Sequence, residues 1–576
     1  MSSGTWNPLW GSWIIEELVR NQVVTFCISP GSRSTPLTTA AARNPQAQCR
    51  IFIDERAAAY FALGHARATG EPAALICTSG TAVANYLPAV VEASVEQLPL
   101  LILSADRPPE LRDSGANQTI DQTKLFGSYV RWFHDPGCPG PETPLPALLS
   151  SLDQAVARTQ APLPGPVHLN FPFREPFFEE TPSEEPAVPE RWRAAPVPWV
   201  RKPRSHSFPE DALISELATH ASRRGILSVG RLPQSELPAV KQLAQALGWP
   251  LFADITSGMR FGPVAQRVTH YDQLLVEGLP STHWEPEVIW HLGFPPTSKR
   301  WLTRWERRPA PEMVWISSQT ERLDASFQFG LQMNSEVSSL TQSLSAHLTH
   351  PGPSDWLAQW QQADQQVAEA LQHHFLQQTC WSELQLAHAL PTWVPEGHAL
   401  YVGNSLPVRL LDFYGSGRGP AVPIGLNRGA SGIDGLIASA AGFAEGLQRP
   451  TTLILGDLST LHDLNSLALL AENRFPITVV LCNNHGGGIF SFLPISQQRD
   501  LFEPFFGTPH SWNFSAAAEL FHLDHQACTS LESCRAAYLR AVQSSRSSVI
   551  EVTTDREINT KEQQRWQQVL RHSFQD

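Results

Sequence analysis

One stretch of the chain, Thr451–Pro494, alternates strand-like and helix-like patterns and ends each strand on a polar side chain. The apolar runs Thr451–Leu455 and Ile477–Cys482 are too short for helices, and they end in Gly456-Asp457 and Asn483-Asn484. Between them, apolar residues recur at helical spacing from residue 464 to residue 471, which predicts one covered helix face. Strand, helix and strand within about 30 residues form a βαβ unit, whose right-handed crossover makes the strands parallel.

Asp457 and Asn484 are therefore expected to leave the carboxyl ends of neighbouring parallel strands, where open α/β sheets bind ligands. A carboxylate and an amide carbonyl are hard oxygen donors, which suit Mg²⁺ shared with the phosphates of a bound molecule. The alternative is an ordinary βαβ unit with polar loop ends. The chain holds no GxxxxGK followed by Ser or Thr, so a Walker-type nucleotide site is a poor competitor.

The length of 576 residues is too great for one hydrophobic core and predicts about three domains. A net charge of −13 argues against a nucleic-acid partner. The first residues lack a signal-peptide pattern, and the long uncharged stretch Ala73–Val91 is broken by polar residues, so neither secretion nor a membrane partner is expected. The eight cysteines contain no C-x-x-C pair, so neither a zinc site nor a disulfide framework is indicated. Together these features point to the cytoplasm.

The N-terminal part of the chain repeats one sequence pattern, a strand-like run followed by polar residues, here called a polar tip. The tips are Pro30–Arg33, Asp54–Glu55, Thr78–Thr81 and Ser104–Pro108. Alternating strands and helices give a parallel sheet, so the tips are expected at one edge. Two of them carry an arginine and one carries a glutamate, which makes this edge a candidate binding site.

The fold class predicted from these patterns is α/β, with three doubly wound domains built on mostly parallel sheets. Residues 1–185 form the first domain, residues 210–350 a smaller middle domain and residues 351–576 the third. The proline-dense residues 186–209 are expected to be a linker whose basic side chains face solvent. The helical pattern of residues 351–390 is expected to lead into the third domain, and Lys561–His572 to form an amphipathic surface helix.

Short strings along the chain resemble those of one enzyme family. They are ISPGSRSTPL, IDERAAAYFALG, TSGTAVANYLPAVVEA, LSADRPPELRDSGANQTIDQ, GNSLPVRLLD, NRGASGIDG, GDLS and NNHGGGIFSFLP. By these strings the chain is identified as similar to the thiamine diphosphate-dependent enzymes. Within that group it resembles the 2-succinyl-5-enolpyruvyl-6-hydroxy-3-cyclohexene-1-carboxylate (SEPHCHC) synthases. The general fingerprint of the group has a glycine where this chain has Leu458, but GDLS is the form found in the synthases.

The resemblance implies a transferase of the carboligase type. Its reaction would be decarboxylation of 2-oxoglutarate and addition of the resulting succinyl carbanion equivalent to isochorismate, in menaquinone or phylloquinone biosynthesis. The implied cofactors are thiamine diphosphate and Mg²⁺ or Mn²⁺. The first domain would bind the pyrimidine and the third the diphosphate. The implied assembly is a homodimer with shared active sites, or a homotetramer.

Carried over residue by residue, the resemblance assigns the metal to Asp457, Asn484 and the carbonyl of Gly486. Glu55 would lie against N1′ of the pyrimidine and favour the tautomer that activates the thiazolium ring; the alternative is an ordinary acidic residue in a first helical turn. Ile433 would wedge the cofactor into its bent shape. The other implied cofactor contacts are Gly403, Asn404, Ser405, Gly456, Leu458, Ser459, Gly487, Gly488, Ile489 and Phe490.

Both implied substrates are dianions, so the site needs several cations, and an arginine fork suits a carboxylate bidentately. The resemblance places isochorismate with Ser32, Arg33, Arg107 and Lys299, the succinyl carboxylate with Ser405, Arg409 and Arg428, and further pocket contacts at Gln118, Ile489, Phe490 and Leu493. Glu55, Gln118, Lys299 and the four arginines are the expected catalytic positions. Taken alone, Lys299 or any one of the arginines is more often a surface residue.

Two alternatives stand beside this assignment. An acetolactate synthase or 2-keto-acid decarboxylase belongs to the same superfamily, but several arginines at the substrate end argue against a substrate with a single carboxylate. A non-catalytic binding protein on the same fold is the alternative from another class, and the presence of Glu55, Asp457 and Asn484 together argues against it.

Overall fold

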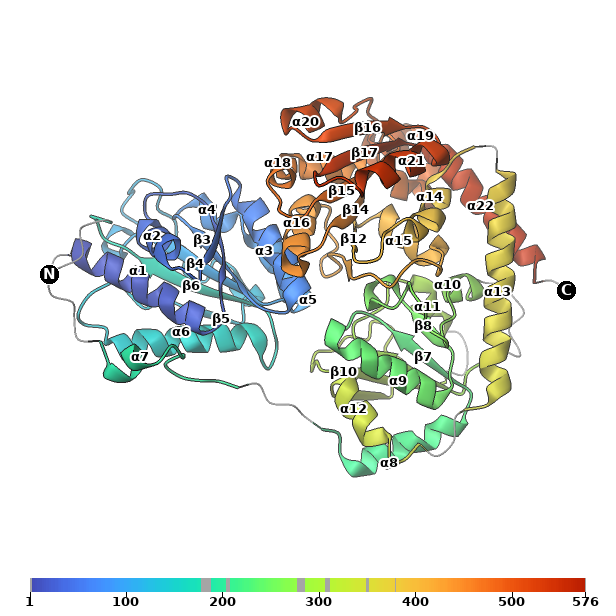
Figure 1. The fold of residues 1–576 in the computed structure, drawn as a ribbon, viewed down its shortest axis with the longest axis horizontal. Coiled ribbons are helices and arrows are strands. Elements are labelled where there is room, and N and C mark those ends of the chain that lie inside the picture. The colour runs from blue at the N-terminus through green and yellow to red at the C-terminus, as the bar shows by residue number, and fades with distance from the viewer. Residues whose placement is uncertain are drawn as a thin grey trace. The chain divides into compact units, whose positions relative to one another are not determined.

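The computed structural model of the chain describes residues 3–177, 188–203, 208–276, 285–305, 311–348, 352–378 and 380–574. Within these residues there are three parallel sheets, each flanked by helices (Figure 1). The predicted α/β class with mostly parallel sheets is therefore confirmed. The chain divides into two compact units, the first comprising residues 1–204, 427–448 and 462–475, and the second residues 205–426, 449–461 and 476–576.

The sheet of the first unit has the strand order β2-β1-β3-β4-β6-β5, and all neighbouring strands are parallel. Its strands are β1 (Thr25–Ile28), β2 (Gln48–Ile51), β3 (Ala73–Cys77), β4 (Leu100–Asp106), β5 (Trp132–His134) and β6 (Pro166–Pro172). Strands β1 to β4 are neighbours and end in the four polar tips, so the tips share one edge, as predicted.

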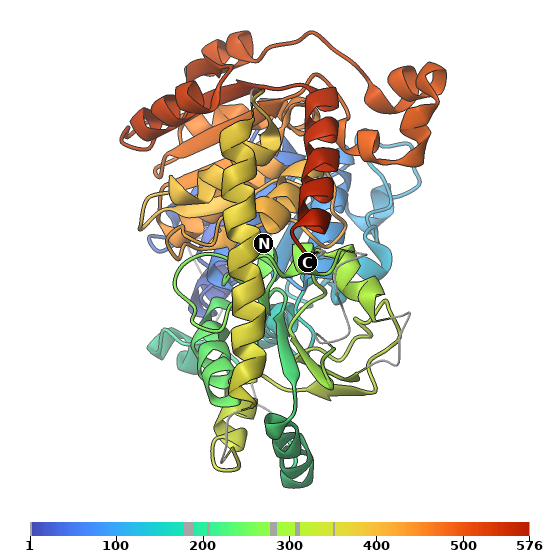
Figure 2. The same ribbon diagram turned by 90° about the vertical axis from the view of Figure 1, so that its right-hand side faces the viewer.

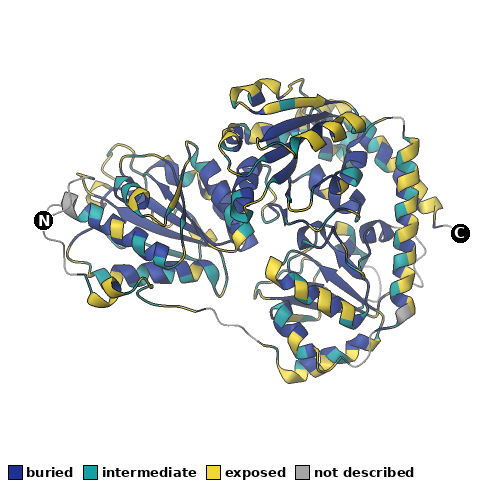
Figure 3. Cartoon of the chain, in the orientation of Figure 1, coloured by how far each residue is buried: buried dark blue, intermediate teal, exposed yellow. Residues whose placement is uncertain are grey.

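Helices α1, α2 and α6 pack with this sheet in one apolar core, and strands β1, β3, β4 and β6 are buried along their whole length (Figure 3). The α-helices of the unit are α1 (Ser3–Arg20), α2 (Thr35–Arg43), α3 (Glu55–Thr69), α4 (Thr81–Ala84), α5 (Leu87–Glu96), α6 (Leu145–Gln160), α7 (Glu190–Ala194), α16 (Leu436–Leu447) and α18 (Leu467–Ala471). Short 3₁₀ turns lie at Pro109–Leu111, Gly127–Tyr129 and Leu464–Ser466.

Helices α3 and α16 approach closely because glycines stand at their contact. A Cβ atom at Gly64 would lie 1.9 Å from the carbonyl oxygen of Ser439, and a Cβ atom at Gly442 would lie 1.9 Å from that of Phe61. No side chain fits at such distances. The contact holds α3, which begins at Glu55, against the segment that carries the loop before α16.

The described part of the expected linker, residues 188–203, packs on the first domain instead of running free. The guanidinium of Arg20 lies 4.0 Å from the ring centre of Trp192, and Glu17 accepts hydrogen bonds from Nε1 of Trp192 and the backbone N–H of Trp199. The basic residues Arg191, Arg193, Arg201 and Lys202 are exposed, as expected, and Arg204 lies outside the described residues.

The second unit contains the other two sheets. The middle sheet has the order β11-β10-β9-β7-β8, and the third sheet has the order β13-β12-β14-β15-β17-β16. The strands of the middle sheet are β7 (Gly225–Val229), β8 (Leu251–Ala253), β9 (Val288–Leu292), β10 (Glu312–Ser317) and β11 (Leu331–Asn334). Those of the third sheet are β12 (Ala399–Val402), β13 (Ile424–Gly425), β14 (Thr451–Gly456), β15 (Ile477–Asn483), β16 (Asp524–Cys528) and β17 (Ser548–Thr553).

Most helices of the second unit are short. The short helices and the two longer ones, α13 and α22, are α8 (Asp211–Thr219), α9 (Leu237–Leu247), α10 (Tyr271–Leu274), α11 (Lys299–Arg304), α12 (Val337–Leu344), α13 (Ser354–Gln377), α14 (Glu383–Ala389), α15 (Leu406–Tyr414), α19 (Arg499–Phe502), α20 (Ser515–Leu520), α21 (Leu531–Ala541) and α22 (Arg556–His572). Helix α17 (Asp457–His462) follows β14. Single 3₁₀ turns occupy His220–Ser222, Gln234–Glu236, Ile255–Ser257, Leu390–Thr392, Gly488–Phe492 and Pro494–Gln497, and Glu503–Gly507 is a π-turn.

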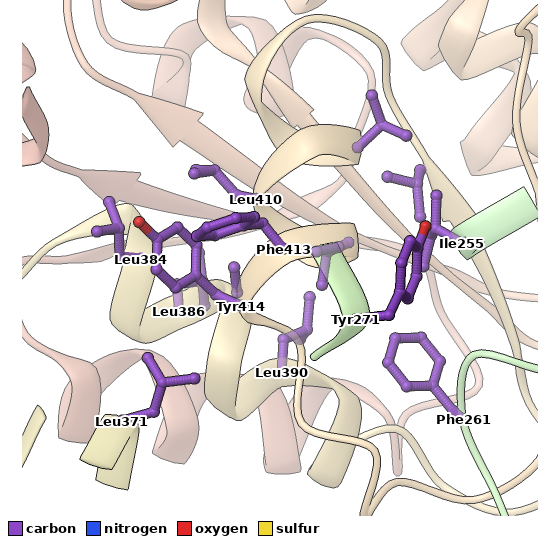
Figure 4. Close-up of a cluster of buried hydrophobic side chains, with 14 of the residues drawn as sticks. Ile255, Phe261, Tyr271, Leu371, Leu384, Leu386, Leu390, Leu410, Phe413 and Tyr414 are labelled. Carbon is purple, nitrogen blue, oxygen red and sulfur yellow. The ribbon is translucent and has the colours of Figure 1, made fainter. Parts of the chain in front are cut away.

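The long helix α13 runs past both sheets of this unit (Figure 2). One apolar core joins the middle and third sheets, and side chains such as Tyr271, Leu371, Leu384 and Phe413 meet there (Figure 4). The single helical segment expected over residues 351–390 is wrong in one respect, because α13 ends at Gln377 and α14 begins after a separate N-cap at Ser382.

The C-terminal helix forms with one buried and one exposed face, as an amphipathic surface helix does. Helix α22 begins earlier than predicted, at Arg556, and buries Trp566 and Leu570 completely. The indole N–H of Trp566 donates to Oε1 of Gln273 at 3.0 Å, so the helix ties the end of the chain to the middle sheet region. Among the described helices, none combines the length and apolar character needed to cross a lipid bilayer.

The buried carboxyl of Glu17 makes the stability of the first unit depend on pH. Burial, and then the neighbouring carboxyl of Asp153, raise its pKa to about 7 from the ordinary 4.5. The folded protein then binds this proton more tightly than the unfolded chain. The Glu17 carboxyl therefore contributes its full stabilisation of the folded state below pH 4.5, and this contribution to the free energy of unfolding is lost as the pH rises to about 7.

We expect Glu17→Gln, which cannot titrate, to gain stability relative to the wild type between about pH 5 and about pH 8. The gain should be on the order of 1–3 kcal/mol, because each pKa unit corresponds to about 1.4 kcal/mol. Urea unfolding followed by tryptophan fluorescence at each pH measures it. A stability difference that stays constant over this range would contradict the prediction.

Candidate functional site

The strand ends of β14 and β15 bring together the residues predicted to bind a metal. These strands are adjacent and parallel, and Gly456 lies opposite Cys482 in their register. Asp457 therefore follows β14 at the same edge where Asn484 follows β15, as predicted. The backbone N–H of Gly486 donates to Oδ2 of Asp457 at 2.9 Å, which joins the two loops directly.

Asp457 is buried, and both of its carboxylate oxygens accept hydrogen bonds. Oδ1 accepts from the backbone N–H of Leu458 at 2.7 Å, and Oδ2 lies 3.1 Å from Nε2 of His510. Because Nδ1 of His510 accepts from the backbone of Trp512, its Nε2 carries the proton and donates to Asp457. Burial raises the pKa of the Asp457 carboxyl, and the hydrogen bonds from Leu458 and Gly486 oppose this rise.

Asn484 presents the clearest sign of a cation site. Its Nδ2 donates to Oε1 of Glu383 at 2.8 Å, whereas its Oδ1 is buried and has no hydrogen-bond partner among the described residues. An unsatisfied buried carbonyl is expensive, so such an atom needs a ligand. The described residues hold no cluster of three His, Cys, Asp or Glu side chains suited to a metal. A carboxylate, an amide oxygen and a backbone carbonyl are nevertheless the donors that Mg²⁺ and Mn²⁺ prefer, so these residues fit such an ion.

A segment from Glu503 to Trp512 closes over the loop that follows β15. The backbone N–H of Gly487 donates to the carbonyl of Gly507 at 2.7 Å, and that of His510 donates to the carbonyl of His485 at 3.3 Å. Gly486 has φ +147°, and a Cβ atom there would lie 2.2 Å from the oxygen of Gly507. Glycine is therefore required at the position whose carbonyl is a predicted metal ligand.

The tip of β12 lies at the same edge as Asp457, because β12 pairs with β14. A Cβ atom at Gly403 would meet that of Leu455 at 2.9 Å, so glycine allows this tip to turn beside β14. Ser405 has φ +73°, and its carbonyl accepts from Nη1 of the exposed Arg409 at 2.7 Å. The turn therefore presents Ser405 and Arg409 together.

The other predicted positions of the second unit divide into three groups. Asn404, Gly456, Leu458 and Ser459 belong to the strand ends, and Gly487, Gly488, Ile489, Phe490 and Leu493 to the loop after β15. Phe490 and Leu493 are 37% and 47% exposed, as suits residues that line a pocket. Lys299 stands apart, because it begins α11 after β9 of the middle sheet, where it is exposed.

In the first unit, Glu55 is the first residue of α3. Asp54 caps this helix through a hydrogen bond from the backbone of Arg56 at 2.8 Å. Glu55 itself is half-buried and accepts from Nδ2 of Asn85 at 3.4 Å. Ile53, two residues before Glu55, is 96% exposed, so a large apolar side chain faces outward near this helix start.

Arg33, Arg107 and Gln118 come together at the tips of β1, β3 and β4. Arg107 donates to Oγ of Ser79, and Nε2 of Gln118 donates to the carbonyl of Ser79 at 2.8 Å. Burial, and then the positive charge of Arg107, lower the pKa of Arg33. The structure thus gathers two partly desolvated guanidiniums, which is the arrangement that an anion stabilises. The exposed Ser32 lies next to Arg33 in the chain.

The loop that carries Arg428 and Ile433 is fixed by contacts within the first unit. Glu92 of α5 accepts from the backbone N–H groups of Gly429 and Ala430 at 2.8 and 2.6 Å. Both Arg428 and Ile433 are half-buried in this loop.

Known proteins resemble the chain throughout its length. Residues 10–125, 187–402 and 423–552 match the N-terminal TPP binding domain, the middle domain and the C-terminal TPP binding domain of thiamine pyrophosphate enzymes. The SEPHCHC synthase of Rubrobacter xylanophilus is 44% identical over 560 residues, covering 96% of each chain. That of Chlorobium phaeobacteroides is 42% identical over 574 residues, covering 98% of each chain. The chain belongs to the SEPHCHC synthase family.

A solved structure supports the fold of this family member. Benzoylformate decarboxylase from Polynucleobacter necessarius superposes with a TM-score of 0.73, covering 95% of this chain and 98% of the other. At 15% identity this likeness concerns the fold alone.

Several residues that shape the site of this synthase were not predicted from its sequence. They are Glu92, Glu383 and His510, together with Ser79, which the sequence marks only as part of a polar tip. Ser79 could have been proposed from the Thr78–Thr81 tip. The other three act on residues far away in the chain, and although Glu92 lies in one of the quoted strings, no local pattern indicates these contacts.

We expect Gly486→Ala to displace the Glu503–Trp512 segment, because the added Cβ atom would collide with the carbonyl of Gly507. Overpacking of this kind typically costs about 1–3 kcal/mol. The measurements are thermal unfolding and amide hydrogen exchange of residues 507–510 in the cofactor-free protein. Gly456→Ala is the matched control, since a Cβ atom there meets nothing within 4 Å. Equal exchange rates in both variants would contradict the prediction.

Proposed function

We propose that the protein decarboxylates 2-oxoglutarate and adds the succinyl carbanion equivalent to isochorismate. The products are SEPHCHC and CO₂, in menaquinone or phylloquinone biosynthesis. The observation that carries this proposal is the buried, unpaired Oδ1 of Asn484 beside the carboxylate of Asp457, at the strand ends where the family binds its cofactor. The names of the relatives supply the product.

The cofactor would be held mainly by the second unit. Asp457, Asn484 and the carbonyl of Gly486 would hold Mg²⁺ or Mn²⁺, which neutralises the diphosphate. When bound, thiamine diphosphate supplies the nucleophilic carbon and the electron sink for the reaction. Glu55 would hold and return the proton at N1′ of the pyrimidine, and its half-buried position at a helix start leaves the carboxylate accessible for this role. Ile433 would support the bent cofactor.

The substrates would be held by two sets of cations. Ser32, Arg33, Arg107, Gln118 and Lys299 would bind isochorismate, and Ser405, Arg409 and Arg428 the distal carboxylate of 2-oxoglutarate. The proximity of Arg33 to Arg107 supports this division, because the charge of Arg107 lowers the pKa of Arg33, and the carboxylate of Glu175, 3.3 Å from Nη2 of Arg33, offsets this effect only in part. Ile489, Phe490 and Leu493 would form the apolar wall of the pocket.

The working form would be a homodimer with shared active sites, or a homotetramer, in the cytoplasm, and without a membrane or nucleic-acid partner. Ile51, the last residue of β2, and Ile53, two residues before Glu55, are 56% and 96% exposed. Covering these side chains by a second copy would remove them from water and place protein around the glutamate. The proposed domain limits are residues 1–185 for pyrimidine binding, 210–350 for the middle domain and 351–576 for diphosphate binding, with 186–209 as linker.

The function is tested with purified protein, thiamine diphosphate and Mg²⁺. CO₂ should be released from 2-oxoglutarate and not from pyruvate, and addition of isochorismate should give SEPHCHC, identified by mass spectrometry. Equal kcat/KM for pyruvate and 2-oxoglutarate would overturn the proposal in favour of a simpler 2-keto-acid enzyme.

Two variants should separate cofactor binding from cofactor activation. Asp457→Ala should lose thiamine diphosphate binding in calorimetry, because the diphosphate loses its bridging cation. Glu55→Gln should bind the cofactor but lose most turnover, since an amide cannot exchange the N1′ proton. If sites are shared, mixed dimers of the two variants should regain part of the activity. Retained cofactor affinity in Asp457→Ala would refute the metal assignment.

The two arginine sets should behave differently in single-turnover experiments. Arg33→Ala should spare CO₂ release and remove ligation, whereas Arg409→Ala should weaken 2-oxoglutarate and favour 2-oxo acids without the second carboxylate. Loss of one charge-assisted contact is worth about 1.5–3 kcal/mol, or roughly ten- to a hundredfold. Arg191→Ala, an exposed arginine outside the site, is the control. Equal losses of both steps in both variants would show that the pocket is not divided in this way.

A further inference from the structure

Glu383 is a buried carboxylate that the proposed reaction does not use. It begins α14 and is 2% exposed. Its Oε1 accepts three hydrogen bonds, from Nδ2 of Asn484 at 2.8 Å, Oγ1 of Thr554 at 2.9 Å and Nδ2 of Asn559 at 2.9 Å. Its own backbone N–H donates to Oδ1 of Asn559 at 2.9 Å. These contacts hold both the side chain and the helix start in one place.

We propose that Glu383 is a positioning residue for the cation, because it fixes the amide of Asn484 with Oδ1 turned toward the metal. A carboxylate only accepts hydrogen bonds, so the NH₂ group of Asn484 must face Glu383 and its Oδ1 must face away. That Oδ1 is the buried atom without a hydrogen-bond partner in the described part of the chain. The inference rests on the proposed function, since the cation is that of the diphosphate site.

The adjacent asparagine shows what distinguishes this pair. Glu551 is also buried, and its Oε1 accepts from Nδ2 of Asn483 at 2.7 Å. However, Oδ1 of Asn483 accepts from the backbone N–H of His485 at 3.2 Å. The two neighbouring amides are thus held by carboxylates in the same way, but only that of Asn484 leaves its oxygen free for a ligand. Partners that orient a metal ligand typically change metal affinity ten- to a hundredfold.

Two conservative variants distinguish the effect of the length of the Glu383 side chain from the effect of its charge. Glu383→Asp keeps the charge but shortens the side chain by about 1.5 Å, so its oxygen cannot reach Asn484. Glu383→Gln keeps an acceptor oxygen at the original distance and loses the charge. Mn²⁺ affinity is measured by electron paramagnetic resonance on the full chain with saturating thiamine diphosphate. Glu551→Asp is the matched control for shortening a carboxylate beside an asparagine.

We expect Glu383→Asp to bind Mn²⁺ about ten- to a hundredfold more weakly and to recover turnover at saturating Mn²⁺. Glu383→Gln and Glu551→Asp should stay within about threefold of the wild type. Unchanged affinity in Glu383→Asp, a greater loss in Glu383→Gln, or an equal loss in Glu551→Asp would each overturn the inference. If Glu383→Asp does not fold, Glu383→Gln decides, because a tenfold loss there would show that charge and not orientation matters. Failure of the wild type to bind Mn²⁺ with thiamine diphosphate would instead refute the proposed function.

Discussion

The parallel pairing of β14 with β15 is the constraint on which the candidate metal site depends. In this register Gly456 lies opposite Cys482, and the residues just beyond them provide a carboxylate from one strand and an amide from the other. A shift of one residue would turn every side chain of a strand to the opposite face. Asp457 would then lose its contact with the backbone of Gly486.

Strand ends alone do not make the site, because polar atoms buried inside a protein need hydrogen-bond partners or ligands. Additional elements of the second unit meet this requirement. Helix α14 brings Glu383 to Asn484, and the segment after α19 brings His510 to Asp457. Helix α14 can occupy this position because Leu384 and Leu386, next to Glu383, are completely buried in the core that the middle and third sheets share (Figure 4). Packing between these sheets therefore decides where a metal-site partner lies.

The sequence predicted covered strands more readily than exposed ones, for a physical reason. The predicted runs Thr451–Leu455 and Ile477–Cys482 are observed as β14 and β15, each one residue longer, because strands covered on both faces are continuous apolar runs. Edge strands such as Asp524–Cys528 are mostly exposed, so their composition resembles that of a loop. Their pairing comes from the neighbouring strand, which a local pattern does not reveal.

Some residues of the candidate site could likewise be predicted from the sequence, and others could not. Residues at strand tips could be proposed from sequence, because a turn after an apolar run marks the edge of a parallel sheet. Glu383 and Asn484 are 101 residues apart, and His510 and Asp457 are 53 apart. Such pairs are created by tertiary packing, and neither periodicity nor spacing along the chain contains them.

A net charge of −13 is compatible with a proposed pair of dianionic substrates, because exposed charges are screened over short distances and buried charges are screened much less. In physiological salt the field of an exposed charge is screened within about 8 Å. A nucleic acid would extend over many such lengths and meet the excess of acidic groups. A small dianion at the tips of β1 and β4 would instead meet Arg33 and Arg107, which are only 5% and 9% exposed and so are poorly screened. Net charge therefore constrains large partners, whereas the burial of two guanidiniums decides what a small ligand encounters.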